Sequence, residues 1–165
     1  MKFAFSIFII WSGLFSQTVE PNPQRLVGLW QDYDNIASGW TDTYQFFPNG
    51  NFIFRYNQMD CDRRNISFSG RWYLLENRML ELDIFQREIM IGGNLEQSFG
   101  SCGTDSALVG AKLQIQKLSP AMELKLGLEI IETVLSGRPD SGKERKRMKI
   151  GGKYFFKMKD DPNKY

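Results

Sequence analysis

The chain has 165 residues, of which 42% are hydrophobic and 14% aromatic, and its formal net charge at pH 7 is +2. It contains no histidine, so Ser-His-Asp and Cys-His nucleophilic catalysis and His-ligated zinc are excluded. We expect no enzymatic activity, no cofactor and no metal site. Catalysis by paired carboxylates is chemically allowed. We interpret Asp32 with Asp34 as a strand-end cap, and Glu81 with Asp83 as part of a solvated strand face.

The first 16 residues have the layout of a secretory signal peptide. Lys2 supplies a positive charge, Phe3 to Trp11 is almost entirely apolar, and the following residues to Gln17 are small or polar. The apolar run is shorter than the ~20 residues that a membrane-spanning helix needs. We expect cleavage near residue 16, a short N-terminal extension over 17–25, and a secreted or periplasmic mature chain. An uncleaved anchor is the alternative.

The rest of the chain alternates apolar and polar residues, a pattern that predicts β-strands and no long helix. Two Gly-x-Trp tripeptides, Gly28-Leu29-Trp30 and Gly70-Arg71-Trp72, each open such a run, and glycine lets the backbone pass close to a neighbouring strand. Pro48-Asn49-Gly50, flanked by aromatic strands, predicts a hairpin turn. The predicted strands cover residues 26–32, 41–47, 51–57, 66–75, 79–85, 107–118, 122–130 and 149–158.

Several segments between these strands are less regular. We expect 87–91 to continue the preceding strand or form another short one, and 92–106 to be a polar loop with at most one short strand. Pro120 is expected to break its run, and a helical tail over 130–135 is left open. Residues 26–159 are thus predicted to form one all-β domain, an antiparallel up-and-down β-barrel of about eight strands, followed by a tail over 160–165.

The two cysteines, Cys61 and Cys102, lie in polar, turn-like segments. In the oxidising compartment that export implies, such cysteines usually pair, and we expect one disulfide. Two free thiols are the alternative. A metal pair is disfavoured because the chain has no histidine and no third cysteine.

Three motifs resemble those of the lipocalin-like domains of the calycin superfamily, particularly the small extracytoplasmic bacterial ones. They are Gly28-Leu29-Trp30, the aromatic-Pro-Asn-Gly-aromatic hairpin over Phe47 to Phe52, and Phe68-Ser69-Gly70-Arg71-Trp72. The family's later Thr-Asp-x-Tyr-type signature and its helix after the last strand are absent from this sequence.

The resemblance implies a carrier of small hydrophobic molecules. It also implies that Gly28 and Trp30 close one end of the barrel, with a basic side chain of the last strand covering the indole. Lys153 or Lys157 takes the place of the arginine that is usual in the family.

Inward-pointing side chains of such a barrel line a cup for a ligand. The candidate ligand-binding residues are Trp40, Tyr44, Phe46, Phe52, Phe54, Phe68, Trp72 and Leu126, and Leu113 and Leu128 are also expected to point inward. The alternative is a core filled by these same side chains. Trp40 is expected near an open end, where its indole contacts a ligand or a partner.

Positive charge is concentrated near the C-terminus. Residues 17–135 have ten basic and fifteen acidic side chains, whereas residues 136–165 have ten basic and four acidic ones. The excess lies in a predicted mobile loop that contains Lys143, Arg145, Lys146, Arg147 and Lys149. Such a loop suits an anionic membrane surface or an envelope protein, and a solvated hairpin tip is the alternative. Nucleic acid is not expected, because no aromatic residues are interleaved with the basic run.

Two hypotheses for function follow. The first is a secreted or periplasmic lipocalin-like binding module, monomeric, for a small hydrophobic ligand or an envelope component. The alternative is a non-enzymatic interaction or structural barrel with a filled core, which contacts anionic surfaces or a protein partner through its basic loop and Trp40.

Overall fold

The computed structural model describes residues 22–164 except positions 36, 101 and 136–143, so the predicted signal peptide lies outside the described residues. The elements are the short 3-10 helices η1 (Pro23–Arg25) and η2 (Ser38–Trp40) and the strands β1 (Gly28–Gln31), β2 (Thr43–Phe46), β3 (Asn51–Arg55), β4 (Asn65–Leu75), β5 (Met79–Ile91), β6 (Asn94–Gln97), β7 (Ser106–Val109), β8 (Lys112–Leu135), β9 (Glu144–Ile150) and β10 (Lys153–Lys159). In the described part of the chain, neither helix has the length or the apolar character needed to cross a membrane.

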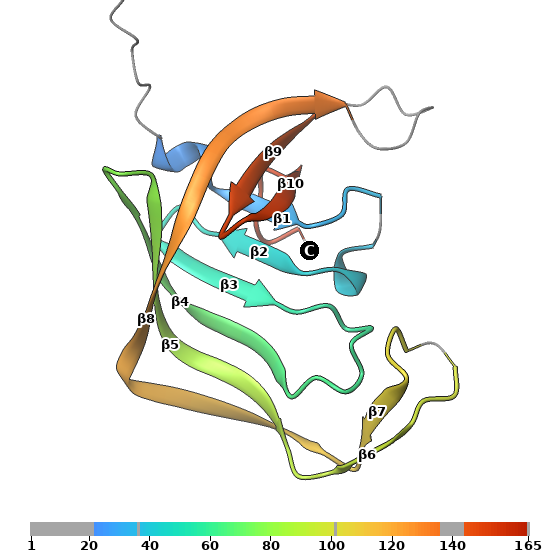
Figure 1. The fold of residues 1–165 in the computed structure, drawn as a ribbon. Helices are drawn as coiled ribbons and strands as arrows, with labels where there is room; N and C mark the ends of the chain where they lie inside the picture. The colour runs from blue at the N-terminus through green and yellow to red at the C-terminus, as the bar shows by residue number, and fades with distance from the viewer. Residues whose placement is uncertain (1–21, 36, 101, 136–143, 165) are drawn as a thin grey trace, which may run out of the picture.

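Eight strands are hydrogen-bonded into a closed ring in the order β1-β10-β9-β8-β5-β4-β3-β2 (Figure 1). Every pair in the ring is antiparallel. Strands that follow one another in the chain are neighbours in the ring, and β6 with β7 forms a separate two-stranded sheet inserted between β5 and β8. The predicted all-β class and the closure of an antiparallel sheet through eight strands are confirmed.

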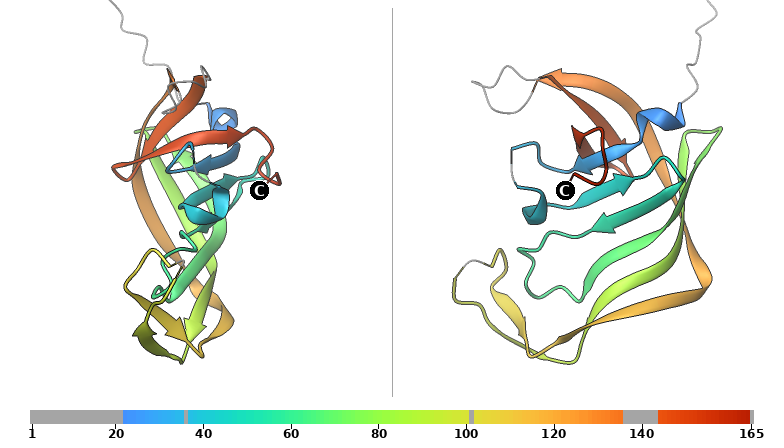
Figure 2. Two further views of the ribbon diagram at one scale, coloured as in Figure 1. Left: turned by 90° about the vertical axis from the view of Figure 1, so that its right-hand side faces the viewer. Right: turned by 180° about the vertical axis from the view of Figure 1, so that it is seen from behind.

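Strand β8 is much longer than the strands that complete the ring beside it. It pairs with β5 from Lys112 to Gly127, whereas its pairing with β9 runs only from Leu128 to Leu135. Beyond β9, the sheet therefore continues as a curved extension of β4, β5 and β8 that ends at the β6–β7 hairpin (Figures 1 and 2).

Several strand boundaries differ from the sequence-based expectations. Residues 92–106 include β6 and the start of β7, and 87–91 continue β5. The expected break at Pro120 and the helical alternative at 130–135 are both wrong, because β8 is continuous. Pro120 lies where β8 has no partner in β9 and where its register with β5 shifts, and proline is tolerated at such an edge or bulge.

The predicted last strand over 149–158 is in fact two strands. Gly151 and Gly152 have positive φ angles of 56° and 89° and form the turn between β9 and β10. Glycine adopts this backbone region at little cost, which makes an adjacent glycine pair a favourable hairpin turn.

The glycines of both Gly-x-Trp motifs lie where two backbones approach each other. A Cβ atom on Gly70 would be 1.8 Å from the carbonyl oxygen of Asp83, where the β4–β5 register shifts. At Gly28, with φ of 137°, a Cβ atom would be 2.5 Å from the carbonyl oxygen of Lys159. Any larger residue would therefore separate strands of the ring at these two positions.

Trp30 is fully buried in the packed end of the ring. Its indole Nε1 donates a hydrogen bond to the carbonyl oxygen of Leu26 at 2.7 Å, and the ammonium of Lys157 lies 5.6 Å from the indole ring. Of the two lysines considered for this place, Lys157 on β10 covers the indole. The surrounding core includes Phe46, which contacts Trp72 edge to face at 5.6 Å between ring centroids.

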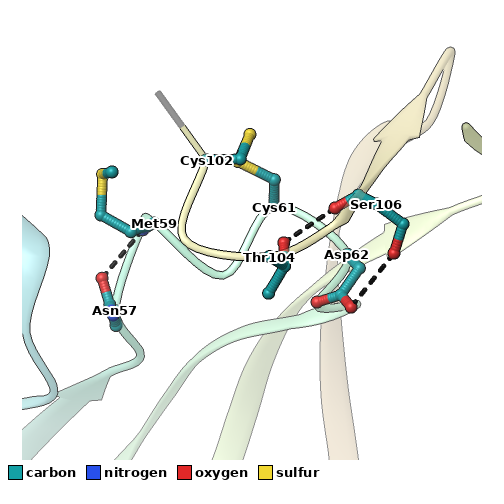
Figure 3. The surroundings of a disulfide bond; sticks show 7 residues. All are labelled: Asn57, Met59, Cys61, Asp62, Cys102, Thr104 and Ser106. Carbon is teal, nitrogen blue, oxygen red and sulfur yellow. Dashed lines mark hydrogen bonds between the residues drawn. A yellow bond between two sulfur atoms is a disulfide. The ribbon is translucent and has the colours of Figure 1, made fainter. Parts of the chain in front are cut away.

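A disulfide joins Cys61, in the loop after β3, to Cys102, in the loop between β6 and β7 (Figure 3). The two Cα atoms are 5.7 Å apart. Backbone hydrogen bonds from Gly103 to Met59 and from Leu108 to Cys61 hold the same two segments together. The disulfide expected from the sequence is confirmed, and it is typical of proteins in an oxidising compartment.

Candidate functional site

The interior of the ring is hollow at the end away from Trp30. A cavity of about 360 Å³ lies there, open to solvent on one side. It is lined by Asp42, Tyr44, Phe52, Phe54, Tyr56, Phe68, Leu82, Ile84, Met122, Leu124, Leu126, Ile150, Gly151, Lys153 and Phe155. Apart from Asp42 and Lys153, these residues are aliphatic, aromatic or glycine.

The two-residue period of the strands places these side chains on one face of the sheet. Tyr44, Phe54 and Phe68 are direct neighbours across β2, β3 and β4. Their ring centroids are 4.6 Å apart for Tyr44 and Phe54, and 6.5 Å apart for Phe54 and Phe68. Phe155 and Tyr44 pack edge to face, with 5.0 Å between their ring centroids. Together they form a continuous aromatic wall.

The facing wall is aliphatic. Leu82 and Ile84 of β5 pair with Leu124 and Met122 of β8 on the same face. Met122 is 45% exposed and Leu124 is 40% exposed although both line the cavity, whereas Leu82 and Ile84 are buried. The cavity therefore presents accessible apolar surface in a concave site, which is typical of sites that take an apolar ligand.

Polar groups gather at the mouth of the cavity. The Nζ atom of Lys153 contacts a carboxylate oxygen of Asp32 and lies 2.8 Å from Oδ2 of Asp42. Oδ1 of Asp42 accepts a hydrogen bond from the backbone N–H of Asn57 at 2.9 Å. One lysine is thus shared by two carboxylates, of which Asp42 also lines the cavity.

The ionisation of these groups follows from their burial and pairing. Burial raises the pKa of Asp32, although the hydrogen bond and the charge of Lys153 oppose this shift. Burial also disfavours the charged form of Lys153. The hydrogen bonds and charges of Asp32 and Asp42 have the larger effect, so the pKa of Lys153 lies above its usual value. The pKa of the Tyr44 phenol is raised mainly by burial, and the group is therefore neutral at physiological pH.

The structure separates the eight candidate ligand-binding residues into three groups. Five line the cavity, namely Tyr44, Phe52, Phe54, Phe68 and Leu126. Phe46 and Trp72 lie in the packed core, and Trp40, in η2, is 58% exposed and does not line the cavity. The end of the ring that contains Trp30 is filled by side chains, whereas the other end is hollow. Contact of any of these residues with a ligand stays a prediction.

The inward direction expected for Leu113 is wrong. This side chain is 57% exposed and lies on the extension of β8, beyond the cavity. Leu128 is buried in the core as expected. The register shift of β8 at Pro120 separates the two halves of the strand, so the alternation read from one half does not carry over to the other.

Some lining residues were not singled out as site residues, for two different reasons. Leu82, Met122 and Leu124 carry the same alternating pattern as the chosen positions, and this signal was present in the sequence. The pairing of Asp42 with Lys153 had no such signal, because the two residues are 111 positions apart and meet only when the ring closes.

The predicted mobile basic loop is partly wrong. Lys143 lies outside the described residues, but Arg145, Lys146, Arg147 and Lys149 belong to β9, which pairs with β8 and β10. Nε of Arg147 donates to Glu132 at 2.9 Å, and Nζ of Lys149 donates to Glu129 at 2.9 Å. Acidic residues of β8 thus compensate two of these cations, and the alternation of charge and apolar residues in 144–150 suits a strand.

Among the described residues, no group of three or more acidic or cysteine side chains is placed to hold a metal ion. Comparison of the chain with known protein families, with curated proteins and with solved structures found no match.

Proposed function

We propose that this protein is a lipocalin-like binding module that holds a small, largely apolar molecule inside its ring of strands. The observation that supports this most directly is the apolar cavity of about 360 Å³. Ligand pockets in proteins generally begin at ~300 Å³ and combine apolar walls with a few polar groups. Asp42 and Lys153 supply such polar groups at the mouth.

The lipocalin-like identity is supported by the closed end of the ring. Eight antiparallel strands follow one another in chain order, Trp30 of the first strand is buried, and Lys157 of the last strand covers it. This is the arrangement that the Gly-x-Trp resemblance implies. The disulfide and the signal-like N-terminus support a secreted or periplasmic site of action.

Two matched substitutions in β8 test this function. Leu124 lines the cavity and Leu113 does not, yet both leucines are partly exposed on the same strand. We expect Leu124→Gln to weaken binding of the neutral fluorescent probe N-phenyl-1-naphthylamine about tenfold, because an amide inside an apolar site loses hydrogen bonds to water. Leu113→Gln is expected to leave binding unchanged.

The measurement is a fluorescence titration of the mature chain and both variants, each first shown to be folded by circular dichroism. A wild-type chain that shows no saturable binding would contradict the proposed function. Equal affinity of the two variants would place the probe outside the cavity.

A groove at the ends of β9 and β10 favours a second function, contact with an anionic membrane surface. This groove, of about 460 Å³, is lined by Glu144, Arg145, Lys146, Lys157, Met158, Lys159 and Asp160. Four of these side chains are basic and two are acidic. Lys157 is paired with Asp160 at 2.8 Å, while Lys146 and Lys159 are exposed beside it. Cations near an anionic bilayer contribute ~1 kcal/mol each.

Charge reversal tests this contact. We expect the double variant Lys146→Glu/Lys159→Glu to lose at least tenfold in binding to phosphatidylglycerol vesicles in a co-sedimentation assay. The control is Lys112→Glu/Lys117→Glu, which makes the same change of net charge on exposed residues of β8 far from the groove. An equal loss in both variants would show that net charge, and not the groove, governs the contact.

A further inference from the structure

We propose that the cavity selects a cationic amphiphile, a molecule with an apolar body and an amine head group. This inference rests on the proposed function and names the chemical class of its ligand. The observations that carry it are the charges at the mouth of the cavity and the way they are already paired.

Among the described residues, Lys153 is the only cation that lines the cavity, and it already has two carboxylate partners. Lys153 contacts Asp32 and Asp42, so these three groups together carry one uncompensated negative charge. A carboxylate head group would compete with Asp32 and Asp42 for this single ammonium and would add a third negative charge. An ammonium head group would instead balance the charge of the cluster.

A second cation near the mouth is also engaged. The guanidinium of Arg63 lies over the ring of Tyr56 at 4.2 Å and pairs with Asp60 at 2.6 Å. It therefore offers little attraction to an anionic ligand. The nearby charges on Asp32, Asp42, Lys153, Arg63 and Asp60 together have an excess of one negative charge.

The two carboxylates are largely shielded from solvent. The side chain of Asp32 is 6% exposed and that of Asp42 is 17% exposed. Oδ1 of Asp32 is buried and has no hydrogen-bond donor among the described residues. Charges are less screened in such surroundings than at a protein surface, so the preference for a cation is stronger there.

The aromatic lining favours the same class of ligand. Tyr44 and Tyr56 line the cavity close to Asp42, and Tyr44 belongs to the aromatic wall described above. The face of a tyrosine ring attracts ammonium groups and has no comparable attraction for a carboxylate. The aliphatic wall of β5 and β8 then accommodates the alkyl body.

The test compares three ligands that share one alkyl chain. Decylamine, decanol and decanoate compete with N-phenyl-1-naphthylamine for the mature chain at pH 7. We expect half-displacement by decylamine at a concentration at least tenfold lower than by decanoate, with decanol between them. Decanoate that competes as well as decylamine would overturn this inference alone. A chain that binds no naphthylamine probe at all would overturn the proposed function and this inference with it.

Two substitutions locate the preference at the mouth. Asp42→Asn keeps an oxygen for the Asn57 N–H, and we expect it to reduce the ratio of amine to acid affinity about tenfold, while the control Asp105→Asn in an exposed loop leaves the ratio unchanged. Lys153→Gln is expected to increase the affinity for decylamine, because it removes the cation that Asp32 and Asp42 share. A Lys153→Gln variant that loses affinity for decanoate and gains none for decylamine would identify Lys153 as a carboxylate-binding group and overturn the inference.

Discussion

Replacing Trp30 by alanine is expected to lower the free energy of unfolding by about 4 kcal/mol, within the usual range for removal of a buried tryptophan. The side chain is fully buried, donates a hydrogen bond to Leu26 and lies under Lys157 of the last strand. Its removal leaves a cavity where the first and last strands of the ring meet. Urea denaturation followed by far-UV circular dichroism measures the loss.

Trp40→Ala is the matched control for this substitution. It makes the same chemical change at a side chain that is 58% exposed, so we expect a loss of no more than about 0.5 kcal/mol. Equal losses in the two variants would contradict the role of Trp30 in closing the ring.

Removal of the disulfide is expected to lower the free energy of unfolding by about as much as Trp30→Ala does. Cys61 and Cys102 are 41 positions apart, and the chain-entropy model assigns ~4 kcal/mol to a loop of this length. We expect the Cys61→Ser/Cys102→Ser variant to unfold at a correspondingly lower urea concentration than the oxidised wild type. The local hydrogen bonds from Gly103 and Leu108 persist in the variant and do not compensate for the lost cross-link.

Reduction supplies the control for this prediction. Dithiothreitol is expected to destabilise the wild type to the level of the double variant and to leave the double variant unchanged. Titration of two free thiols in the unfolded, unreduced wild type would contradict the disulfide itself.

The sequence predicted the ring of strands because its signals are local. The alternation of Tyr44 with Phe46 and of Phe52 with Phe54 fixes which face of each strand is apolar, and the Pro48-Asn49-Gly50 turn fixes their register. The Gly70-Arg71-Trp72 motif likewise indicated a close backbone approach, which the structure has at Asp83.

Other features were missed although a signal was present. Gly151-Gly152 is a pair of residues typical of tight hairpin turns, yet the alternation on both sides favours one strand. Pro120 predicts the end of a strand, because the sequence does not show that β8 lacks a partner in β9 at that point. The charge of the basic segment favours a loop, although Met148 and Ile150 alternate with its cations and are buried.

The polar groups at the mouth of the cavity could not be predicted from the sequence, because no local pattern indicates them. Asp32 and Asp42 are close in the chain, but Lys153 lies 111 positions after Asp42 and meets them because β10 pairs with β1. The loop position of Trp40 predicts a ligand contact, and only the three-dimensional arrangement shows that this residue lies outside the cavity.

The location of a bound ligand decides whether the cavity inside the ring is the binding site. Crystals of the mature chain soaked with 10-bromodecylamine would reveal the bromine by its anomalous scattering. We expect the bromine among Phe52, Leu82 and Leu126, with the amine beside Asp42. Bromine found only outside the ring, for example beside the exposed Leu95 and Phe99, or a cavity that stays empty at saturating ligand, would contradict this expectation.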